Sequence, residues 1–183
     1  MKIVNTPLQG LCEIHTDSLN DSRGRFTRLF CEHELSAIRP QLHFTQINLS
    51  DTKQKASIRG LHFQHAPAAE AKLIRCLRGR VFDVAVDIRK DSATFMQWHA
   101  VELNESNDVA VFIPEGFAHG FQSLSDNVQL LYMHTAAWSQ QHESGLRHDD
   151  LRLAIDWPLA VSNISEKDAH FPLIQNGFAG VES

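Results

Sequence analysis

The chain has few cysteines, a single tyrosine and no excess of positive charge. Its three cysteines, Cys12, Cys31 and Cys76, are odd in number and share no metal-type spacing. They favour buried or free thiols in a reducing compartment over a disulfide framework. The formal net charge is -5 and the isoelectric point is about 6.1, which argues against nucleic-acid and membrane partners because such partners usually require a basic surface.

Long apolar runs are also lacking. No run approaches about 18 residues, and only the four residues of Met1–Val4 precede the polar Asn5, without the apolar segment or cleavage pattern of a signal peptide. We therefore expect a soluble, cytoplasmic protein. In the absence of repeats and linkers, 183 residues fit one domain over 1–183 with a sizeable core. The polar, glycine-containing end from Gln175 predicts a disordered tail.

The abundant signal is that of β-strands, which dominates residues 42–158. Within Val81–Ile88, apolar residues at even positions alternate with a mixed, acid-containing set at odd positions. This period of two places the two sets on opposite faces of a strand. Residues 72–77 indicate a partner strand, and Arg78–Arg80 with its central glycine predicts the turn of a hairpin between the two.

Other strands are indicated between polar turns, at 42–49, 58–64, 97–103, 109–113, 120–124 and 128–135. Helical signals are confined to the edges of the chain, at Glu32–Ile38, in a turn near Asp149–Leu153 and from Ser165. Many short strands at this spacing are typical of a β-sandwich or a β-barrel. The pattern therefore predicts a mainly β protein with a few short peripheral helices.

Two motifs, Arg59–Gln64 and Pro114–Gly120, each place a histidine beside glycines in strand-like surroundings. Alternation puts His62 on the same face of its strand as Gly60 and Gln64. With Lys72 on the next strand, that face carries more polar groups than a dry core tolerates, because each unpaired one costs about 1–3 kcal/mol. We therefore expect His62 and His119 to face one wet, concave site.

Four other residues allow two interpretations each. Tyr132, the only tyrosine, also fits an aromatic that fills a barrel interior with its hydroxyl hydrogen-bonded. Asp168 lies three positions after Ser165, which is the spacing of a helix capping box. Arg23 and Arg59 precede glycines, which suits phosphate contact beside exposed backbone but is also an ordinary turn sequence.

These residues lie in motifs that resemble those of the dTDP-4-dehydrorhamnose 3,5-epimerase family and its nucleotide-sugar epimerase relatives. The resemblance covers most of the chain, and its motifs are specific in combination although each is weak alone. They are Asp21–Gly24, Gln46–Asn48, Ser57–Gln64, Glu70–Leu73, Arg78–Asp87, Ile113–Phe121, Tyr132, Glu143–Gly145, Ile155–Pro158 and Ser165–Asp168. The resemblance implies a cupin-type β-barrel, or jelly roll, that forms a homodimer with exchanged N-terminal strands.

The activity implied by this resemblance is epimerisation, without a cofactor, at C3' and C5' of a dTDP-4-keto-6-deoxyhexose. A proton beside the ketone is removable because the charge left behind spreads onto the carbonyl oxygen as an enolate. By the same resemblance, His62 is the base and Asp168 orients its imidazole. Lys72 would stabilise the enolate, and Tyr132 would return a proton from the opposite face.

The resemblance also assigns contacts to the rest of the substrate. Arg59 and His119 correspond to diphosphate contacts, and Arg23 corresponds to a contact made from the partner subunit. Trp138 stands where a tyrosine is more usual and, with Phe26, would sandwich the base. Further nucleotide or sugar contacts are implied at Gln46, Asn48, Lys72, Glu143 and Lys167.

Several features of the substrate stay open. Arg28 stands where many family members have a glutamate, and a cation in place of an acceptor changes which edge of a base is read. The motifs do not decide whether C3', C5' or both are inverted, nor do they name the end-product sugar. An isomerase that moves the ketone from C4' to C3' is the nearest alternative, although retention of both His62 and Tyr132 favours epimerisation.

A metal-dependent cupin enzyme is another alternative, because Pro114, Gly116 and His119 have the spacing of a cupin metal motif. The first metal motif requires His-x-His followed by a glutamate, whereas this chain has His62–Gln64. Lys72 occupies the ligand region, and an ammonium does not coordinate a cation. We therefore expect no metal. The complete set of candidate catalytic residues also disfavours a non-catalytic sugar-binding barrel.

Overall fold

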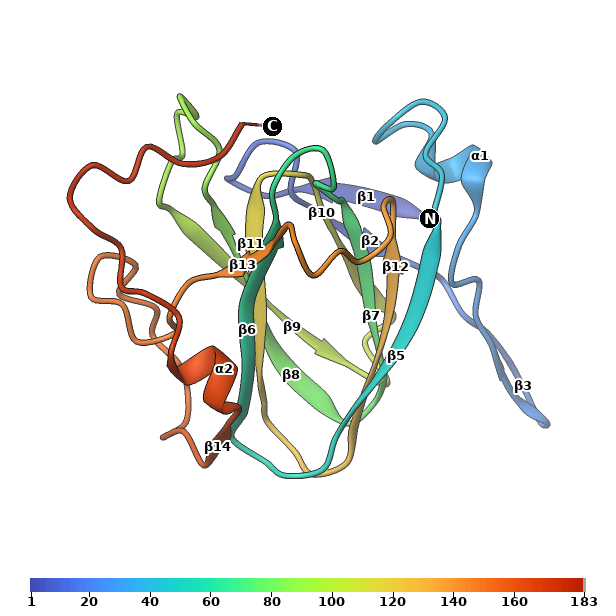
Figure 1. Cartoon of the computed structure of the whole chain (residues 1–183). Coiled ribbons are helices and arrows are strands. Elements are labelled where there is room, and N and C mark those ends of the chain that lie inside the picture. The colour runs from blue at the N-terminus through green and yellow to red at the C-terminus, as the bar shows by residue number, and fades with distance from the viewer. Residues whose placement is uncertain (183) are drawn as a thin grey trace.

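In the computed structural model, which describes residues 1–182, two antiparallel sheets face each other (Figure 1). The first sheet has the order β1 (Lys2–Asn5), β2 (Cys12–His15), β10 (Val109–Ile113), β7 (Lys72–Arg78), β12 (Val128–His134) and β5 (Gln46–Thr52). The second has the order β13 (Glu143–Gly145), β6 (Ser57–Gln64), β11 (Phe117–Ser123), β8 (Arg80–Asp87) and β9 (Trp98–Asn104). A short strand, β14 (Asn163–Ile164), runs parallel to β6.

Three small elements lie outside the two sheets. A hairpin of β3 (Leu19–Asp21) and β4 (Gly24–Phe26) projects away from the sheets (Figure 1). The helices α1 (Glu32–Leu35) and α2 (Glu166–Ala169) have four residues each. In the described part of the chain no helix is long and apolar enough to cross a membrane.

The main core fills the space between the two sheets. Ile74 and Leu130 enter it from the first sheet, and Leu103 and Phe121 enter it from the second. All four are almost completely buried. Since apolar area removed from water stabilises a fold by about 25 cal/mol per Å², this layer holds the sheets together. The two-sheet jelly-roll barrel confirms the predicted mainly β, cupin-type fold with a few short helices.

A second core covers the outer face of the second sheet. Val84 and Val86 of β8 pack there with Leu153, Ile174 and other residues of the C-terminal third. The alternation predicted for β8 is confirmed, because its even-numbered residues face this second core while odd-numbered residues enter the barrel interior. One strand is thus buried on both faces.

The predicted hairpin between β7 and β8 is wrong. β7 pairs with β10 and β12, whereas β8 pairs with β11 and β9 in the other sheet. The chain crosses between the sheets at Gly79, which has a φ of +72°, and a Cβ there would lie 2.5 Å from the hydroxyl of Ser125. Because β7 and β8 both contribute to the main core, they face each other across it rather than lying side by side.

Two strand boundaries and the chain end also differ from the sequence pattern. β5 begins at Gln46 and not near residue 42, and β11 begins at Phe117, so it includes His119. The tail for which the sequence predicts disorder returns to the second core. There the amide of Val181 donates to the carbonyl of Ile88 at 2.8 Å, and the Val181 side chain is buried.

Candidate active site

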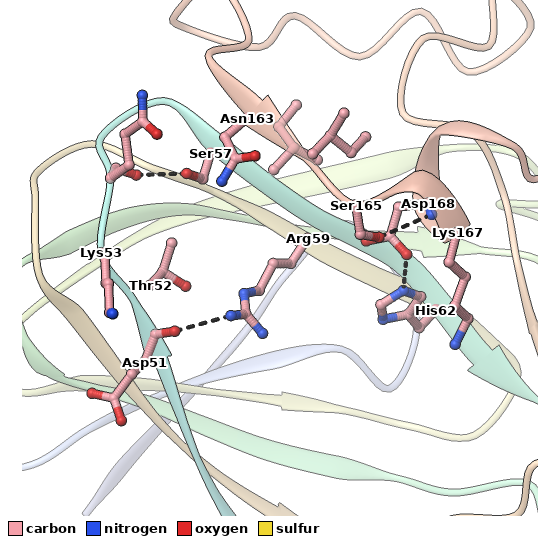
Figure 2. A pocket seen from close by; sticks show the side chains of 13 residues that line it. Asp51, Thr52, Lys53, Ser57, Arg59, His62, Asn163, Ser165, Lys167 and Asp168 are labelled. Carbon is pink, nitrogen blue, oxygen red and sulfur yellow. Dashed lines mark hydrogen bonds and ion pairs between the residues drawn. The ribbon is translucent and has the colours of Figure 1, made fainter.

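A cavity of about 660 Å³ opens along the edge of the second sheet, between the end of β5, the length of β6 and the segment from β14 to α2 (Figure 2). This volume lies within the usual range for small-molecule sites, about 300–1,000 Å³. The wall consists mainly of charged and polar side chains, and Ile58 and Ile164 are its apolar members. The lining residues are Asp51–Gln54, Ser57–Arg59, His62, Asn163–Ser165, Lys167 and Asp168.

His62 and Asp168 form a hydrogen-bonded pair in this wall. Nε2 of His62 lies 2.7 Å from Oδ1 of Asp168, and the side chains are 33% and 5% exposed (Figure 2). The other carboxylate oxygen accepts the backbone amide of Gly60 at 3.0 Å. The imidazole thus has a fixed orientation and an open side toward the cavity.

Helix α2 carries Asp168 to this position. The Asp168 amide donates to the Ser165 side chain at 3.1 Å, so the predicted capping spacing is real and the carboxylate is left free for His62. Burial alone would raise the pKa of Asp168, but the hydrogen bonds and charge of His62 and the amide of Gly60 hold it below its usual value. Asp168 therefore stays ionised near neutral pH.

Two glycines allow β6 and β11 to approach closely beside the site. Gly60 has a φ of +117°, and a Cβ on it would lie 2.6 Å from the Cα of Gly120. The pairing places His62 opposite His119, followed by a register shift between His119 and Phe121. The two histidines of the sequence motifs therefore lie on neighbouring strands. The predicted shared wet site is not found for both, because His62 lines the cavity whereas the His119 side chain is only 5% exposed.

His119 has its own carboxylate partner, Asp83 of β8. Its Nε2 lies 2.9 Å from Oδ2 of Asp83, and the two side chains are only 5% and 2% exposed. Burial lowers the pKa of His119, against the opposing effect of the Asp83 charge. His119 is therefore neutral near pH 7 and is not one of the residues that line the cavity.

Tyr132 lies in β12 of the first sheet, on the opposite wall of the barrel from His62. It packs against the main core, its ring meets that of His119 edge-on at 5.9 Å between centroids, and it stacks on His134 at 5.8 Å. Burial, with a smaller contribution from the charge of Asp83, raises the pKa of Tyr132 well above its usual value. Its hydroxyl accordingly keeps its proton.

Lys72 lies inside the barrel next to the carboxylate of Glu70. Its Nζ is 3.3 Å from Glu70 and donates to the carbonyl of His62 at 3.4 Å. The Glu70 carboxylate also accepts a hydrogen bond from Nδ1 of His134 at 2.9 Å. Burial works to raise the pKa of Glu70, but the hydrogen bond from His134 and the charges of Lys72 and His134 bring it below its usual value.

Some of the residues predicted to contact the nucleotide or the diphosphate lie beside this arrangement. Arg59 reaches along the cavity and donates to the carbonyl of Asp51 at 2.9 Å (Figure 2). Lys167 pairs with Glu143 at 2.6 Å. Three further candidates are near one another at the β12 end, where the Gln46 side chain accepts the Trp138 amide and the Asn48 amide lies 3.4 Å from His134.

Of the predicted site residues, only Arg59, His62, Lys167 and Asp168 line the cavity. Three of the others are exposed at the surface of the subunit. Arg23 and Phe26 lie on the β3–β4 hairpin, with an 87% exposed side chain at Arg23 and 73% exposure at Phe26. Arg23 pairs with Asp21 at 2.6 Å, and Arg28 pairs with Glu34. None of the three is among the residues that line the cavity.

Sequence reasoning assigned no role to three residues that the structure places in the site. Asp83 is one of the odd-numbered β8 residues, and the alternation already directed it to the barrel interior. Glu70 lies two residues before Lys72, and His134 two residues after Tyr132, so each shares the side of its candidate neighbour. This two-residue spacing was the sequence feature that could have identified Glu70 and His134.

Among residues 1–182, histidine, cysteine and carboxylate side chains do not gather in groups of three that could hold a metal ion. The two histidines of the motifs each turn Nε2 to a separate carboxylate. The fold is a cupin-type barrel, and its interior holds histidine–carboxylate pairs together with Lys72 and Tyr132.

Comparison with known proteins places the chain in a family. The profile of the dTDP-4-dehydrorhamnose 3,5-epimerase family matches residues 5–176. A dTDP-4-dehydrorhamnose 3,5-epimerase of Methanothermobacter thermautotrophicus is 40% identical over 179 residues, which are 96% of either chain. A dTDP-4-dehydrorhamnose 3-epimerase of Streptomyces niveus is 34% identical over 169 residues, 92% of this chain and 81% of that one.

A solved structure agrees over the whole length. The dTDP-6-deoxy-D-glucose-3,5-epimerase of Legionella pneumophila, in complex with dTDP-4-keto-L-rhamnose, superposes with a TM-score of 0.92. It is 37% identical, and the match covers 100% of this chain and 98% of that one. The chain belongs to the dTDP-4-dehydrorhamnose 3,5-epimerase family. It is an isomerase of the nucleotide-sugar epimerase class.

Proposed function

We propose that this protein inverts C3' and C5' of dTDP-4-dehydro-6-deoxyglucose and so forms dTDP-4-dehydro-L-rhamnose. The observation that carries the proposal is the His62–Asp168 pair, which opens onto a cavity of about 660 Å³. An ionised carboxylate that orients an accessible imidazole is the arrangement of a general base. The 3,5-epimerases among the relatives support the choice of substrate.

The reaction begins with removal of a proton from a carbon beside the C4' ketone. His62 takes that proton, Asp168 stabilises the imidazolium, and the electron pair of the broken C–H bond moves onto the ketone oxygen as an enolate. The Lys72 ammonium, held by Glu70 at 3.3 Å, supplies positive charge inside the barrel for this oxygen. Stabilisation by a fixed charge is strong where water is largely excluded.

Inversion requires a proton from the other face. Tyr132 and His62 come from opposite sheets, so a sugar ring between them would have one on each face. The raised pKa of Tyr132 keeps its hydroxyl protonated until the enolate forms. The hydroxyl then donates its proton to the carbon as the enolate collapses, and exchange with solvent restores both groups.

The dTDP portion is assigned to the cations and polar groups along the cavity. Arg59 and Lys167 are cavity-lining cations that suit a diphosphate. Gln46, Asn48 and Glu143 supply polar contacts to the nucleotide or sugar, and Trp138 supplies an aromatic face for the base. His119 is buried against Tyr132, so its predicted diphosphate contact would require the substrate to extend inward past His62.

A homodimer would complete the site. Arg23 and Phe26 sit on a projecting hairpin, and the edge strand β5 exposes Ile47 and Leu49. Exposed apolar side chains beside an unpaired strand edge favour pairing with another chain. We place the hairpin of one subunit against the cavity of its partner, where Arg23 meets the diphosphate and Phe26 the base.

Subunit exchange tests the shared site. Arg23→Ala and His62→Asn variants are inactive separately in this proposal, whereas a mixture forms heterodimers in which one of the two sites is intact. An equal mixture should regain about a quarter of the wild-type activity, as expected for random two-fold pairing. A monomer in light scattering, or no recovery from mixing, would contradict it.

The reaction itself is tested by proton NMR in deuterium oxide, with EDTA-treated protein and dTDP-4-keto-6-deoxyglucose. The proposal expects deuterium at C3' and C5' and a product of the L-lyxo configuration. No exchange would reject this substrate. The same experiment with sugars carried by other nucleotides would then test whether Arg28 changes which base is bound. Activity that returns only with added divalent ions would favour the metal-dependent alternative.

A single-centre epimerase is the second candidate, because one relative is a dTDP-4-dehydrorhamnose 3-epimerase at 34% identity. The same NMR experiment separates the two. Deuterium and inversion at C3' alone would identify the single-centre enzyme. It would leave the roles of His62 and Tyr132 unchanged.

A further inference from the structure

One cluster in the barrel has no assigned role: the carboxylate of Glu70 and the imidazole of His134, which stand between two candidate catalytic residues. Glu70 lies just before β7, and His134 ends β12, where it pairs in register with Lys72. The amide of Ala71, between Glu70 and Lys72, donates to the Thr135 side chain at 2.8 Å. The two strand ends are thus fixed to each other.

The hydrogen bonds determine how His134 is protonated. Its Nδ1 faces Glu70 at 2.9 Å, and an ionised carboxylate only accepts, so Nδ1 carries a proton. Its Nε2 lies 3.4 Å from the side-chain amide of Asn48. Glu70 therefore has two partners, the Nδ1–H of His134 and the Lys72 ammonium.

The same imidazole supports Tyr132. The two rings are stacked at 5.8 Å with an angle of 11° between their planes, on the side of β12 that faces the barrel. Glu70 and His134 are nearly enclosed, with side chains 8% and 12% exposed. A carboxylate in such a place persists only with partners, and Lys72 and His134 are those partners.

We propose that Glu70 and His134 are a positioning pair for this reaction: Glu70 holds the Lys72 ammonium charged and in place, and His134 fixes both Glu70 and the Tyr132 ring. This inference rests on the proposed function, and neither residue touches the reacting carbons. Glu70 serves the enolate-forming step through Lys72. His134 serves the proton-returning step through Tyr132.

The first test is the pH profile of kcat/KM in Glu70→Gln and Glu70→Asp. Lys72 contacts the Glu70 carboxylate and the carbonyl of His62. His134 is its partner in register on β12, and the Lys72 charge acts on His119. Removing the Glu70 charge disfavours the charged ammonium, so the alkaline limb should move down by about one pH unit or more. Glu70→Asp keeps the charge and should restore the wild-type limb.

The second test compares deuterium incorporation with inversion in His134→Ala. Proton removal by His62 should continue, whereas a displaced Tyr132 should lower the ratio of inverted product to incorporated deuterium by about tenfold, which is less than the ~10²–10⁴-fold effect of losing an acid or base altogether. The exposed variants His43→Ala and Glu102→Gln serve as matched controls and should match the wild type. A purely structural role would lower both quantities together.

A measurement without substrate tests the positioning pair independently of the proposed reaction. NMR titration of ¹³C-labelled lysine, assigned through Lys72→Arg, follows the Lys72 ammonium in the free protein. A titration that moves to lower pH in Glu70→Gln supports the positioning pair even if the chosen sugar nucleotide is wrong. An unmoved titration and alkaline limb, or an unchanged ratio in His134→Ala, would overturn the proposal.

Discussion

Two histidine–carboxylate pairs lie next to each other in this barrel and differ mainly in their access to the cavity. His62 and His119 are opposite each other on β6 and β11, and their Nε2 atoms are 2.7 and 2.9 Å from a carboxylate. The His62 side chain is 33% exposed and that of His119 only 5%. Identical residue types thus occupy two different environments a few ångströms apart.

The difference teaches that the origin of the carboxylate sets the role of the pair. Asp83 comes from the neighbouring strand β8, so His119 is enclosed within the sheet. Asp168 comes from α2, which approaches β6 from outside and leaves one side of His62 open. Only in the second arrangement does the histidine face the cavity, as the proposed role of a base requires.

The largest effect that tests this contrast is on proton removal. His62→Ala should abolish exchange of the sugar protons with deuterium oxide, since loss of a general base costs about 10²–10⁴-fold in rate. NMR with the same substrate measures it, and a folded control comes from the circular dichroism spectrum. Exchange at the wild-type rate would remove His62 from the role of base.

For the free energy of unfolding, we expect the buried His119 pair to matter more than the His62 pair. Asp83→Ala leaves the buried His119 nitrogen without a partner, which costs about 1–3 kcal/mol of the free energy of unfolding. His62→Ala removes a side chain that is partly exposed, so its cost should be smaller. Urea unfolding of both variants compares them, and an equal loss would contradict the different burial of the two pairs.

A smaller effect is expected in the pH dependence of stability. The pKa of His119 is lowered from 6.5 in the folded protein, so below this pH the unfolded chain binds more protons and the free energy of unfolding falls. His148, whose pKa is also lowered by burial, acts in the same direction. His119→Gln should therefore reduce, without abolishing, the loss of stability between about pH 7 and pH 5. Urea titrations at each pH measure the slope, and an unchanged slope would contradict a buried, neutral His119.

Local patterns in the sequence predicted much of the fold and of the site. Alternation along β8 identified its two faces, and the three-residue spacing before Asp168 identified a cap that the structure retains. The motif resemblance brought His62 and Asp168 together although they are 106 positions apart. These features depend on residue order alone or on a pattern that covers most of the chain.

Features that depend on which strands face each other were not predicted. The turn at Gly79 looked like a hairpin, but the chain crosses there between sheets because both strands contribute to one core. The contacts of Asp83 with His119 and of Glu70 with His134 were missed for the same reason, since pairing across strands requires the register. Arg23 and Phe26 remain predictions that need a second subunit.

The most direct test of the proton-transfer account is Tyr132→Phe, followed by NMR in deuterium oxide with dTDP-4-keto-6-deoxyglucose. The substitution keeps the ring that stacks on His134 and removes only the hydroxyl. The account expects deuterium to enter at C3', because His62 still removes that proton, with little net inversion because no donor stands on the opposite face. Inversion at the wild-type rate would contradict it.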